Sequence, residues 1–294
     1  MGAFNKEEVT AEAKKQLWLA LPLIVVTMLQ FSLTIVSAIF VGHLGALPLA
    51  GASMAVCFTS VTGFSVLAGM GSALDTLCGQ ANGAKQYHMV GIHMQRATLI
   101  LLILCIPLAF IWANTYHILV LLRQEANISA EAGVFARWMI LSVFAYAIHQ
   151  CLCRFLQSQN NICPMMISTG ITALLHILLC WILVIKFRMG GKGPAMAISI
   201  STWLNSLLLI FYVKFSSACE KTWAGFSKAA LRDTMKFMRL AVPSACMVCM
   251  RSWALQLMVF MSGFLPEAKF KTSVMSIGLA SLSATSIILT INFC

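Results

Sequence analysis

The sequence predicts an all-α polytopic membrane protein with about eight transmembrane helices. Its 294 residues are 60% hydrophobic and only 10% charged, whereas an ordinary soluble domain is roughly 45–50% apolar and about 25% charged. Apolar runs of about 20 residues, the length that crosses a bilayer core, recur between turn signals. These runs are far longer than the roughly ten alternating residues of a barrel strand, so they are expected to be helices whose backbone bonds internally.

Eight such runs are expected, and most of the loops between them are short. In order, they cover residues 17–41, 48–72, 97–118, 137–157, 165–187, 194–215, 237–263 and 271–291. The first run follows a charged leader, KEEVTAEAKKQ, and no small-residue cleavage site comes after it. Because it is also longer than the apolar part of a signal peptide, we expect it to be retained as the first helix.

The distribution of basic residues predicts a cytoplasmic N-terminus. In that orientation 12 basic residues lie inside, 7 lie outside and Arg251 lies within a span, which agrees with the positive-inside rule. The largest inside group lies in residues 214–239. A basic loop beside a membrane typically sets the topology near anionic headgroups, so the lipid bilayer, and no nucleic acid, is the expected partner. The plasma membrane and the vacuolar membrane both remain open as locations.

The start of the first span is repeated 221 residues later. LALPLIVVTMLQ aligns with LAVPSACMVCMR, so that Pro22 matches Pro243, and Gly42 matches Gly263 in the same register. Six spans separate the copies, so both begin on the same side of the membrane, as in the parallel repeats of some transporters. The first unit has six helices but the second has only two. We therefore expect a complete first lobe and an incomplete second lobe, as in a fragment or truncated product.

Two stretches carry a family resemblance, VGHLGALPLAGASMA at residues 41–55 and VTGFSVLAGMGSALDTLCGQANGAKQYHMVGIHMQR at 61–96. They resemble the multidrug and toxic compound extrusion (MATE) transporters, in particular the plant detoxification proteins, and similar segments extend across nearly the whole chain. The resemblance implies a twelve-helix, two-lobe antiporter. Such a protein exports organic cations or other amphiphilic solutes in exchange for protons or sodium by exposing a central cavity alternately to the two sides.

The resemblance and the repeat divide the chain in the same way. The expected parts are a cytoplasmic N-terminal segment (1–16), a first six-helix lobe (17–215), a basic cytoplasmic inter-lobe loop (216–236) and the first two helices of an incomplete second lobe (237–294).

Arg251 departs from the family pattern. Relatives resemble one another in carrying a glutamate in the seventh helix and a second one a few residues later, where this sequence has Arg251 and Gln256. A carboxylate in a membrane cavity can bind a proton or a cationic solute in turn, whereas arginine stays protonated and glutamine cannot titrate. Two interpretations remain open: an altered site that favours anions, or a decayed coupling site in a protein that does not transport.

The resemblance also implies cavity residues on the first and seventh helices. Gln30 is the repeat equivalent of Arg251, and Thr34 follows it on the same helix face; Trp253 and Gln256 are the candidates on the seventh helix. Gln30 is equally interpretable as a residue that packs helices together. Trp253 is expected either to stack on an aromatic cation or to hold the Arg251 guanidinium.

Several polar residues are expected to have structural roles. The family signature contains Gly42, His43, Asp75, Thr76 and Gln80. Asp75 lies where the second span meets the cytoplasm, and we expect it to cap or bond the following loop around Gln80. His149 and His176 lie inside spans, where core hydrogen bonding is favoured over proton transfer.

The sequence contains no metal-ligand cluster, phosphate-binding loop or nucleophile with a base, so no enzyme activity, cofactor or metal is expected. The eleven cysteines lie mostly inside spans and predict no disulfide framework; Cys246 and Cys249 are interpreted as small apolar fillers. The expected partners are small organic solutes, with protons or sodium as the coupling ion. The alternative function is a non-transporting truncated membrane protein, or a regulatory partner of a full-length transporter.

Overall fold

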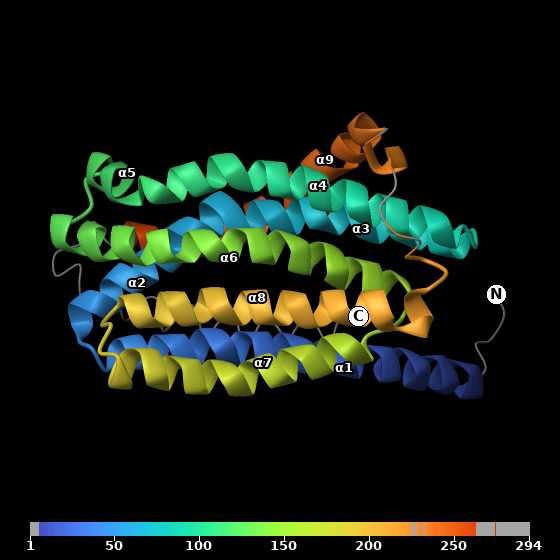
Figure 1. Ribbon diagram of the computed structural model, residues 1–294, viewed down its shortest axis with the longest axis horizontal. Coiled ribbons are helices and arrows are strands. Elements are labelled where there is room, and N and C mark those ends of the chain that lie inside the picture. The colour runs from blue at the N-terminus through green and yellow to red at the C-terminus, as the bar shows by residue number, and fades with distance from the viewer. Residues whose placement is uncertain (1–5, 224, 226–227, 232, 263–273, 275–294) are drawn as a thin grey trace.

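The computed structural model describes residues 6–223, 225, 228–231, 233–262 and 274, and the described residues form helices and no strand (Figure 1). The helices are α1 (Lys6–Gly42), α2 (Ala46–Thr59), η1 (Ser60–Phe64), α3 (Ser65–Gly83), α4 (Tyr87–Ala113), α5 (Thr115–Leu121), α6 (Ala126–Ser158), α7 (Cys163–Trp181), η2 (Ile182–Lys186), α8 (Lys192–Phe215), η3 (Ser217–Cys219), η4 (Lys228–Leu231) and α9 (Thr234–Ser262).

Six stretches of the described chain are long and apolar enough to cross a membrane, which confirms the first six predicted spans. They are Leu21–Gly42, Ala46–Gly83, Tyr87–Ala113, Ala126–Ser158, Cys163–Lys186 and Lys192–Phe215. The seventh predicted span corresponds to α9, which is helical up to Ser262 but is not among these six. The eighth, 271–291, lies outside the described residues apart from Val274.

The helix ends differ from the predicted ones where polar residues continue a helix or interrupt it. The charged leader is helical, since α1 begins at Lys6. The second span extends to Gly83 through α2, η1 and α3. The third ends at Ala113, because a turn at Asn114 interrupts the helix before the short helix α5 begins. Hydropathy locates the apolar part of a helix, but hydrogen bonding at the polar ends decides where the helix stops.

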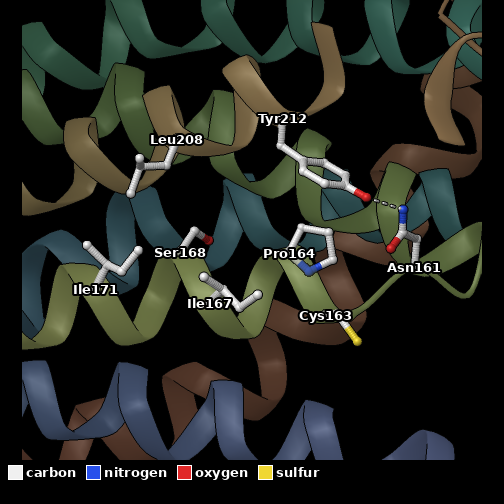
Figure 2. A pocket seen from close by; sticks show the side chains of 8 residues that line it. All are labelled: Asn161, Cys163, Pro164, Ile167, Ser168, Ile171, Leu208 and Tyr212. Atoms are coloured by element: carbon white, nitrogen blue, oxygen red, sulfur yellow. Dashed lines mark hydrogen bonds between the residues drawn. The ribbon is translucent and has the colours of Figure 1, made fainter. Parts of the chain in front are cut away.

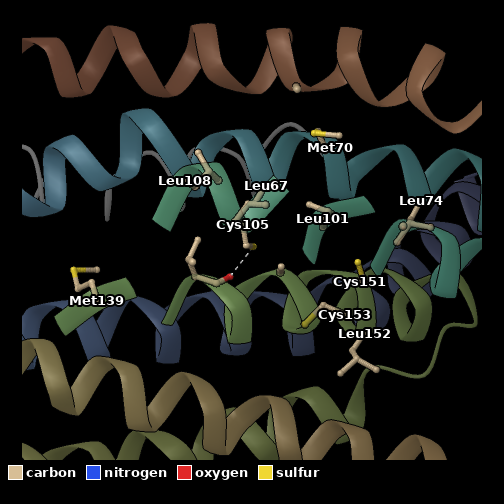
Figure 3. Packing of buried hydrophobic residues seen from close by; sticks show 14 of the residues in the cluster. Leu67, Met70, Leu74, Leu101, Cys105, Leu108, Met139, Cys151, Leu152 and Cys153 are labelled. Carbon is tan, nitrogen blue, oxygen red and sulfur yellow. Dashed lines mark hydrogen bonds between the residues drawn. The ribbon is translucent and has the colours of Figure 1, made fainter. Parts of the chain in front are cut away.

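α6 lies at the centre of the bundle, where it packs against α8, α4, α2 and α3. On one side of it, α1 packs on α7 and α7 on α8; on the other side, α9 packs on α3. Figure 3 shows the core between α3, α4 and α6, in which Leu67, Leu74, Leu101, Cys105 and Cys151 are almost wholly buried. Lipid is as apolar as these side chains, so the helices are held mainly by close packing and by hydrogen bonds between them.

Candidate functional site

α9 packs against α3, and the contact is formed by a row of small residues. Ala241, Ala245 and Cys249, spaced four residues apart on one helix face, are all buried. Opposite them, a Cβ added to Gly69 would lie only 2.6 Å from the Ala245 Cα atom. The two backbones therefore approach as closely as a glycine permits, and this contact joins α9 to the six-helix bundle.

The α3–α9 contact continues into a π-helical turn, η1, where the hydrogen bonding of the second span changes. The Ser65 N–H donates to the Ser60 carbonyl, five residues back, in place of the α-helical acceptor, which would be Val61. The Val61 carbonyl instead accepts the indole N–H of Trp253 at 2.9 Å and the Ser65 hydroxyl at 3.2 Å. Short π segments inside α-helices are frequent at functional sites, and here the irregular turn provides an acceptor for a side chain of α9.

Trp253 has a contact that the sequence did not predict. Its indole nitrogen bonds to the backbone of η1, and the cation–π contact found among the described residues is that of Lys214 over Phe215. The Gln256 backbone carbonyl accepts the Cys57 thiol at 3.1 Å, which ties the same part of α9 to α2. Two of the predicted cavity residues thus hold α9 against the second span.

Arg251 points away from this contact. It comes two residues after Cys249, the last member of the buried row on α9, and two residues correspond to about 200° around a helix. The Arg251 side chain is exposed, and its neighbours Met247 and Met250 are 76% and 74% exposed. This outer face of α9, defined here by Met247, Met250 and Arg251, carries a permanent charge. No described carboxylate forms an ion pair with it.

The first-lobe candidates lie apart from those on α9. Gln30 and Thr34 are exposed on α1, but α1 packs chiefly against α7, whereas α9 packs chiefly against α3. The described contacts therefore do not bring the predicted residues of the two helices together. Gly42 ends α1, and His43 is exposed in the turn that follows.

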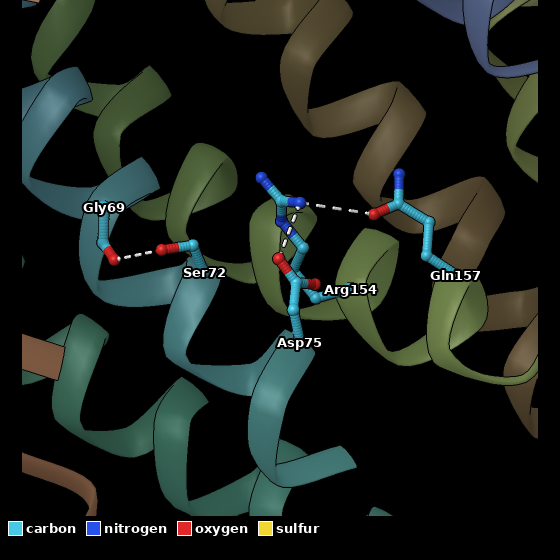
Figure 4. A network of polar contacts seen from close by, with 5 residues as sticks. All are labelled: Gly69, Ser72, Asp75, Arg154 and Gln157. Atoms are coloured by element: carbon cyan, nitrogen blue, oxygen red, sulfur yellow. Dashed lines mark hydrogen bonds and ion pairs between the residues drawn. The ribbon is translucent and has the colours of Figure 1, made fainter. Parts of the chain in front are cut away.

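Asp75 has a structural contact, but with a partner that differs from the expected loop (Figure 4). Its carboxylate accepts a hydrogen bond from Arg154 on α6 at 2.9 Å, and the same guanidinium nitrogen lies 3.4 Å from the Gln157 side-chain oxygen. The pair joins α3 to α6 at the end of the bundle where both helices stop. Both side chains are partly exposed, so the contact is expected to contribute less than about 1 kcal/mol. Thr76 and Gln80 are exposed beside it.

The two buried histidines occupy hydrogen-bonded sites in the core. His176 is fully buried and lies 2.9 Å from the Ser37 hydroxyl on α1 and 2.8 Å from the Ser201 hydroxyl on α8. His149 bonds to the Asn205 amide at 3.2 Å. Both histidines therefore have the expected core bonds. The serines that complete the first site carry no distinctive sequence signal, because serine is common in membrane helices.

A shallow groove of about 260 Å³ lies between α7 and α8 (Figure 2). Its wall is mostly apolar, and its polar end is a hydrogen bond of 3.0 Å from the Asn161 amide to the Tyr212 hydroxyl. It is lined by Asn161, Cys163, Pro164, Ile167, Ser168, Ile171, Leu208 and Tyr212. None of these side chains is charged, so the groove offers a surface for apolar chains and no group that would recognise an ion. The described residues also contain no cluster of three metal-binding side chains.

Comparisons with known proteins agree with this architecture. The family model MatE matches residues 22–182. Protein DETOXIFICATION 16 of Arabidopsis thaliana is 57% identical over 273 residues, which are 93% of this chain and 56% of that protein. Protein DETOXIFICATION 17 of the same plant is 54% identical over 269 residues, 92% of this chain and 56% of its own length.

Among solved structures, the crystal structure of the eukaryotic MATE transporter AtDTX14 is similar to this chain, with a TM-score of 0.88 and 43% identity. The match covers 95% of this chain and 62% of the AtDTX14 chain. The present chain thus spans a little over half the length of the curated relatives it matches.

Proposed function

The chain belongs to the MatE family of multidrug and toxic compound extrusion transporters, and we propose that it exports solutes across a membrane. The proposed substrates are organic cations or other amphiphilic solutes, exported in exchange for protons, with sodium as the alternative coupling ion. Since the chain spans 56% of its curated relatives, this activity is a proposal for the protein as a whole. A cytoplasmic N-terminus in the plasma or vacuolar membrane belongs to the same proposal.

The observation that carries the proposal is the position of α9 on the six-helix bundle. α9 begins the second lobe expected from the repeat, and it is held to the second span by Gly69, Ser65 and the η1 carbonyl. Its outer face, with Arg251, points away from that bundle, and we propose that a second lobe encloses a cavity on this side. Alternating access needs two bodies that meet along such a contact.

Arg251 and Gln256 limit how that cavity can work. Neither side chain can bind and release a proton near neutral pH. These two positions therefore cannot couple the movement of protons to the movement of a solute. A guanidinium on a cavity wall would repel an organic cation and attract an organic anion. Arg251 therefore favours efflux of organic anions over efflux of organic cations.

The second candidate function is a non-transporting membrane protein that associates with a full-length relative and regulates it. The specific observation in its favour is the loss of both carboxylates on α9, because a copy without coupling groups would be released from the constraint to transport. This candidate predicts binding to a relative and no solute flux.

Proteoliposomes with an acidic lumen distinguish the two candidates. Antiport predicts that the purified chain accumulates a fluorescent organic cation, or instead a fluorescent organic anion, and that a protonophore abolishes the accumulation. Absence of flux for both probes, together with co-purification of a co-expressed full-length relative, would establish the second candidate in place of the first.

A further inference from the structure

The described part of the segment between the six-helix bundle and α9 packs against the bundle. This segment, residues 216–233, of which 216–223, 225, 228–231 and 233 are described, is called the connector here; the sequence predicted it to be part of a basic inter-lobe loop. Cys219 in η3 is fully buried, Thr222 is 4% exposed, and Ala230 in η4 is 2% exposed. A solvated linker would leave these side chains in water, so the connector must have a specific binding surface on the bundle.

Arg96, near the beginning of α4, provides the main polar contact with the connector. Its guanidinium donates hydrogen bonds to the carbonyls of Ala230 at 3.3 Å and Ala229 at 3.2 Å, and it lies 3.2 Å from the His93 Nδ1 atom. Both carbonyls belong to the short helix η4, so the guanidinium contacts its backbone directly.

The charge of Arg96 is buried, and no carboxylate of the described residues forms an ion pair with it. The side chain is 5% exposed, and the two ion pairs formed by the described residues, Asp75–Arg154 and Asp233–Lys236, do not include it. A buried cation is costly unless its donors are satisfied. The guanidinium and η4 therefore stabilise each other: without the connector the cation loses two acceptors, and without Arg96 the two carbonyls lose the bonds that the guanidinium donates.

Two further contacts hold the earlier part of the connector. The Gln95 amide donates to the Gly225 carbonyl at 2.7 Å, and the Thr222 hydroxyl donates to the Gln159 side-chain oxygen at 3.1 Å in the turn after α6. Gly91, one turn before Gln95, lies directly under the connector, because a Cβ at this position would collide with the Thr222 carbonyl oxygen. The contact surface thus follows one face of α4 through residues 91 and 95.

α9 starts immediately after the connector, at Thr234. Phe237, in its first turn, is fully buried and belongs to the same apolar core as the side chains of α3, α4 and α6. The start of α9 is therefore attached to the six-helix bundle in two places: by the connector before it and by Phe237 within it.

We propose that Arg96 is a positioning residue that binds the connector to the six-helix bundle and thereby fixes the first turn of α9. The connector then moves with the six-helix bundle, so the mechanical boundary between the lobes lies beyond Phe237 and not in residues 216–236. The connector contact is independent of the proposed efflux activity; only the consequence that lobe movement begins beyond Phe237 rests on it.

The test uses the purified full chain and needs no transport assay. The rate of maleimide modification of each cysteine is read by peptide mass spectrometry in wild type, Arg96→Met and Gly91→Val. We expect Cys219 to react slowly in the wild type because it is buried. Burial also raises the pKa of its thiol, and the thiolate is the reactive form. In each variant we expect Cys219 to react about tenfold faster or more, since a buried backbone acceptor loses its donor or is displaced.

Controls separate loss of the connector contact from loss of the fold. Cys151, which is fully buried in α6, should stay unreactive in all variants. Arg154→Met removes another arginine at the same end of the bundle, and Gly79→Val adds a side chain where no atom lies within 4 Å; both should leave Cys219 slow. Amide hydrogen exchange of residues 234–238 should become faster in Arg96→Met.

A faster Cys219 in Arg96→Met, with Cys151 unchanged, supports the role of Arg96, and the same result in Gly91→Val supports the packing of the connector on α4. The proposal is overturned if Cys219 stays slow in Arg96→Met, or if it becomes faster there only together with Cys151. Its positioning part is overturned if Cys219 becomes faster while hydrogen exchange at residues 234–238 does not change.

Discussion

His176 shows how one side chain can join three membrane helices. It is carried by α7, and its two ring nitrogens lie within hydrogen-bond distance of Ser37 on α1 and Ser201 on α8. A neutral imidazole offers one donor and one acceptor, and a serine hydroxyl can complement either. The site is thus satisfied with no charge inside the membrane.

Replacement of His176 by leucine should destabilise the bundle. The substitution leaves the hydroxyls of Ser37 and Ser201 buried without this partner, which typically costs about 1–3 kcal/mol. The measurement is the thermal unfolding midpoint of the purified protein in detergent. His117→Leu is the control because His117 is exposed; equal midpoints for the two variants would show that the buried bonds contribute nothing.

A single methyl group at Gly69 should weaken the contact between α3 and α9. The new Cβ would lie 2.6 Å from the Ala245 Cα and 3.1 Å from the Val248 Cβ, and a backbone atom cannot move aside without moving its helix. Overpacking of this kind costs about 1–3 kcal/mol. Gly69→Ala should therefore unfold at a lower temperature and expose Cys249 to maleimide. Gly79→Ala, in the same helix but with open space around it, should do neither.

At the scale of elements, the π turn is the irregular feature that joins two helices distant in sequence. Trp253 reaches it from α9, and Trp112 reaches it from α4 by donating to the Thr62 hydroxyl at 3.0 Å. The indole nitrogens of both tryptophans therefore bond to groups of η1. The turn is fixed by its neighbours as well as by its own backbone.

Trp253→Phe should weaken this arrangement while keeping an aromatic ring on α9. The Val61 carbonyl then loses its indole donor, at a cost of about 0.5–1.5 kcal/mol for one hydrogen bond. We expect a small decrease in the unfolding midpoint and faster amide exchange in residues 60–66. Trp181→Phe is the matched control, since Trp181 is 50% exposed and Trp253 is 41% exposed, but among the described residues only the Trp253 indole of these two donates a hydrogen bond. An unchanged exchange rate in Trp253→Phe would argue against a role of the indole in fixing η1.

The sequence predicts the apolar helices well and the contacts of polar side chains poorly. Six spans were predictable because each contains an apolar run long enough for a bilayer. The prolines matched by the repeat, Pro22 and Pro243, lie inside α1 and α9. The partners of polar side chains were not predictable, because they come from distant segments. Asp75 binds Arg154 rather than the adjacent loop, and Arg96 immediately precedes a predicted span yet holds the connector.

At the scale of the whole molecule, α6 separates two groups of helices. α1, α7 and α8 lie on one side, and α3, α4 and α9 lie on the other (Figure 1). The candidate residues Gln30 and Thr34 belong to the first group, whereas Arg251 lies on the outer face of α9 in the second. If the proposed cavity lies along that outer face, the charge at residue 251 governs which solutes can enter it.

Whether Arg251 lies on the transport path can be tested by measuring solute transport in proteoliposomes that contain wild type, Arg251→Glu or Arg251→Lys. Two like charges about 8 Å apart at an effective dielectric constant of about 20 repel by about 2 kcal/mol, or roughly thirtyfold in affinity. Arg251→Glu should therefore increase proton-driven accumulation of an organic cation by at least about tenfold and decrease that of an organic anion, while Arg251→Lys resembles the wild type. Identical transport of both solutes by all three proteins would contradict the placement of Arg251 on the transport path.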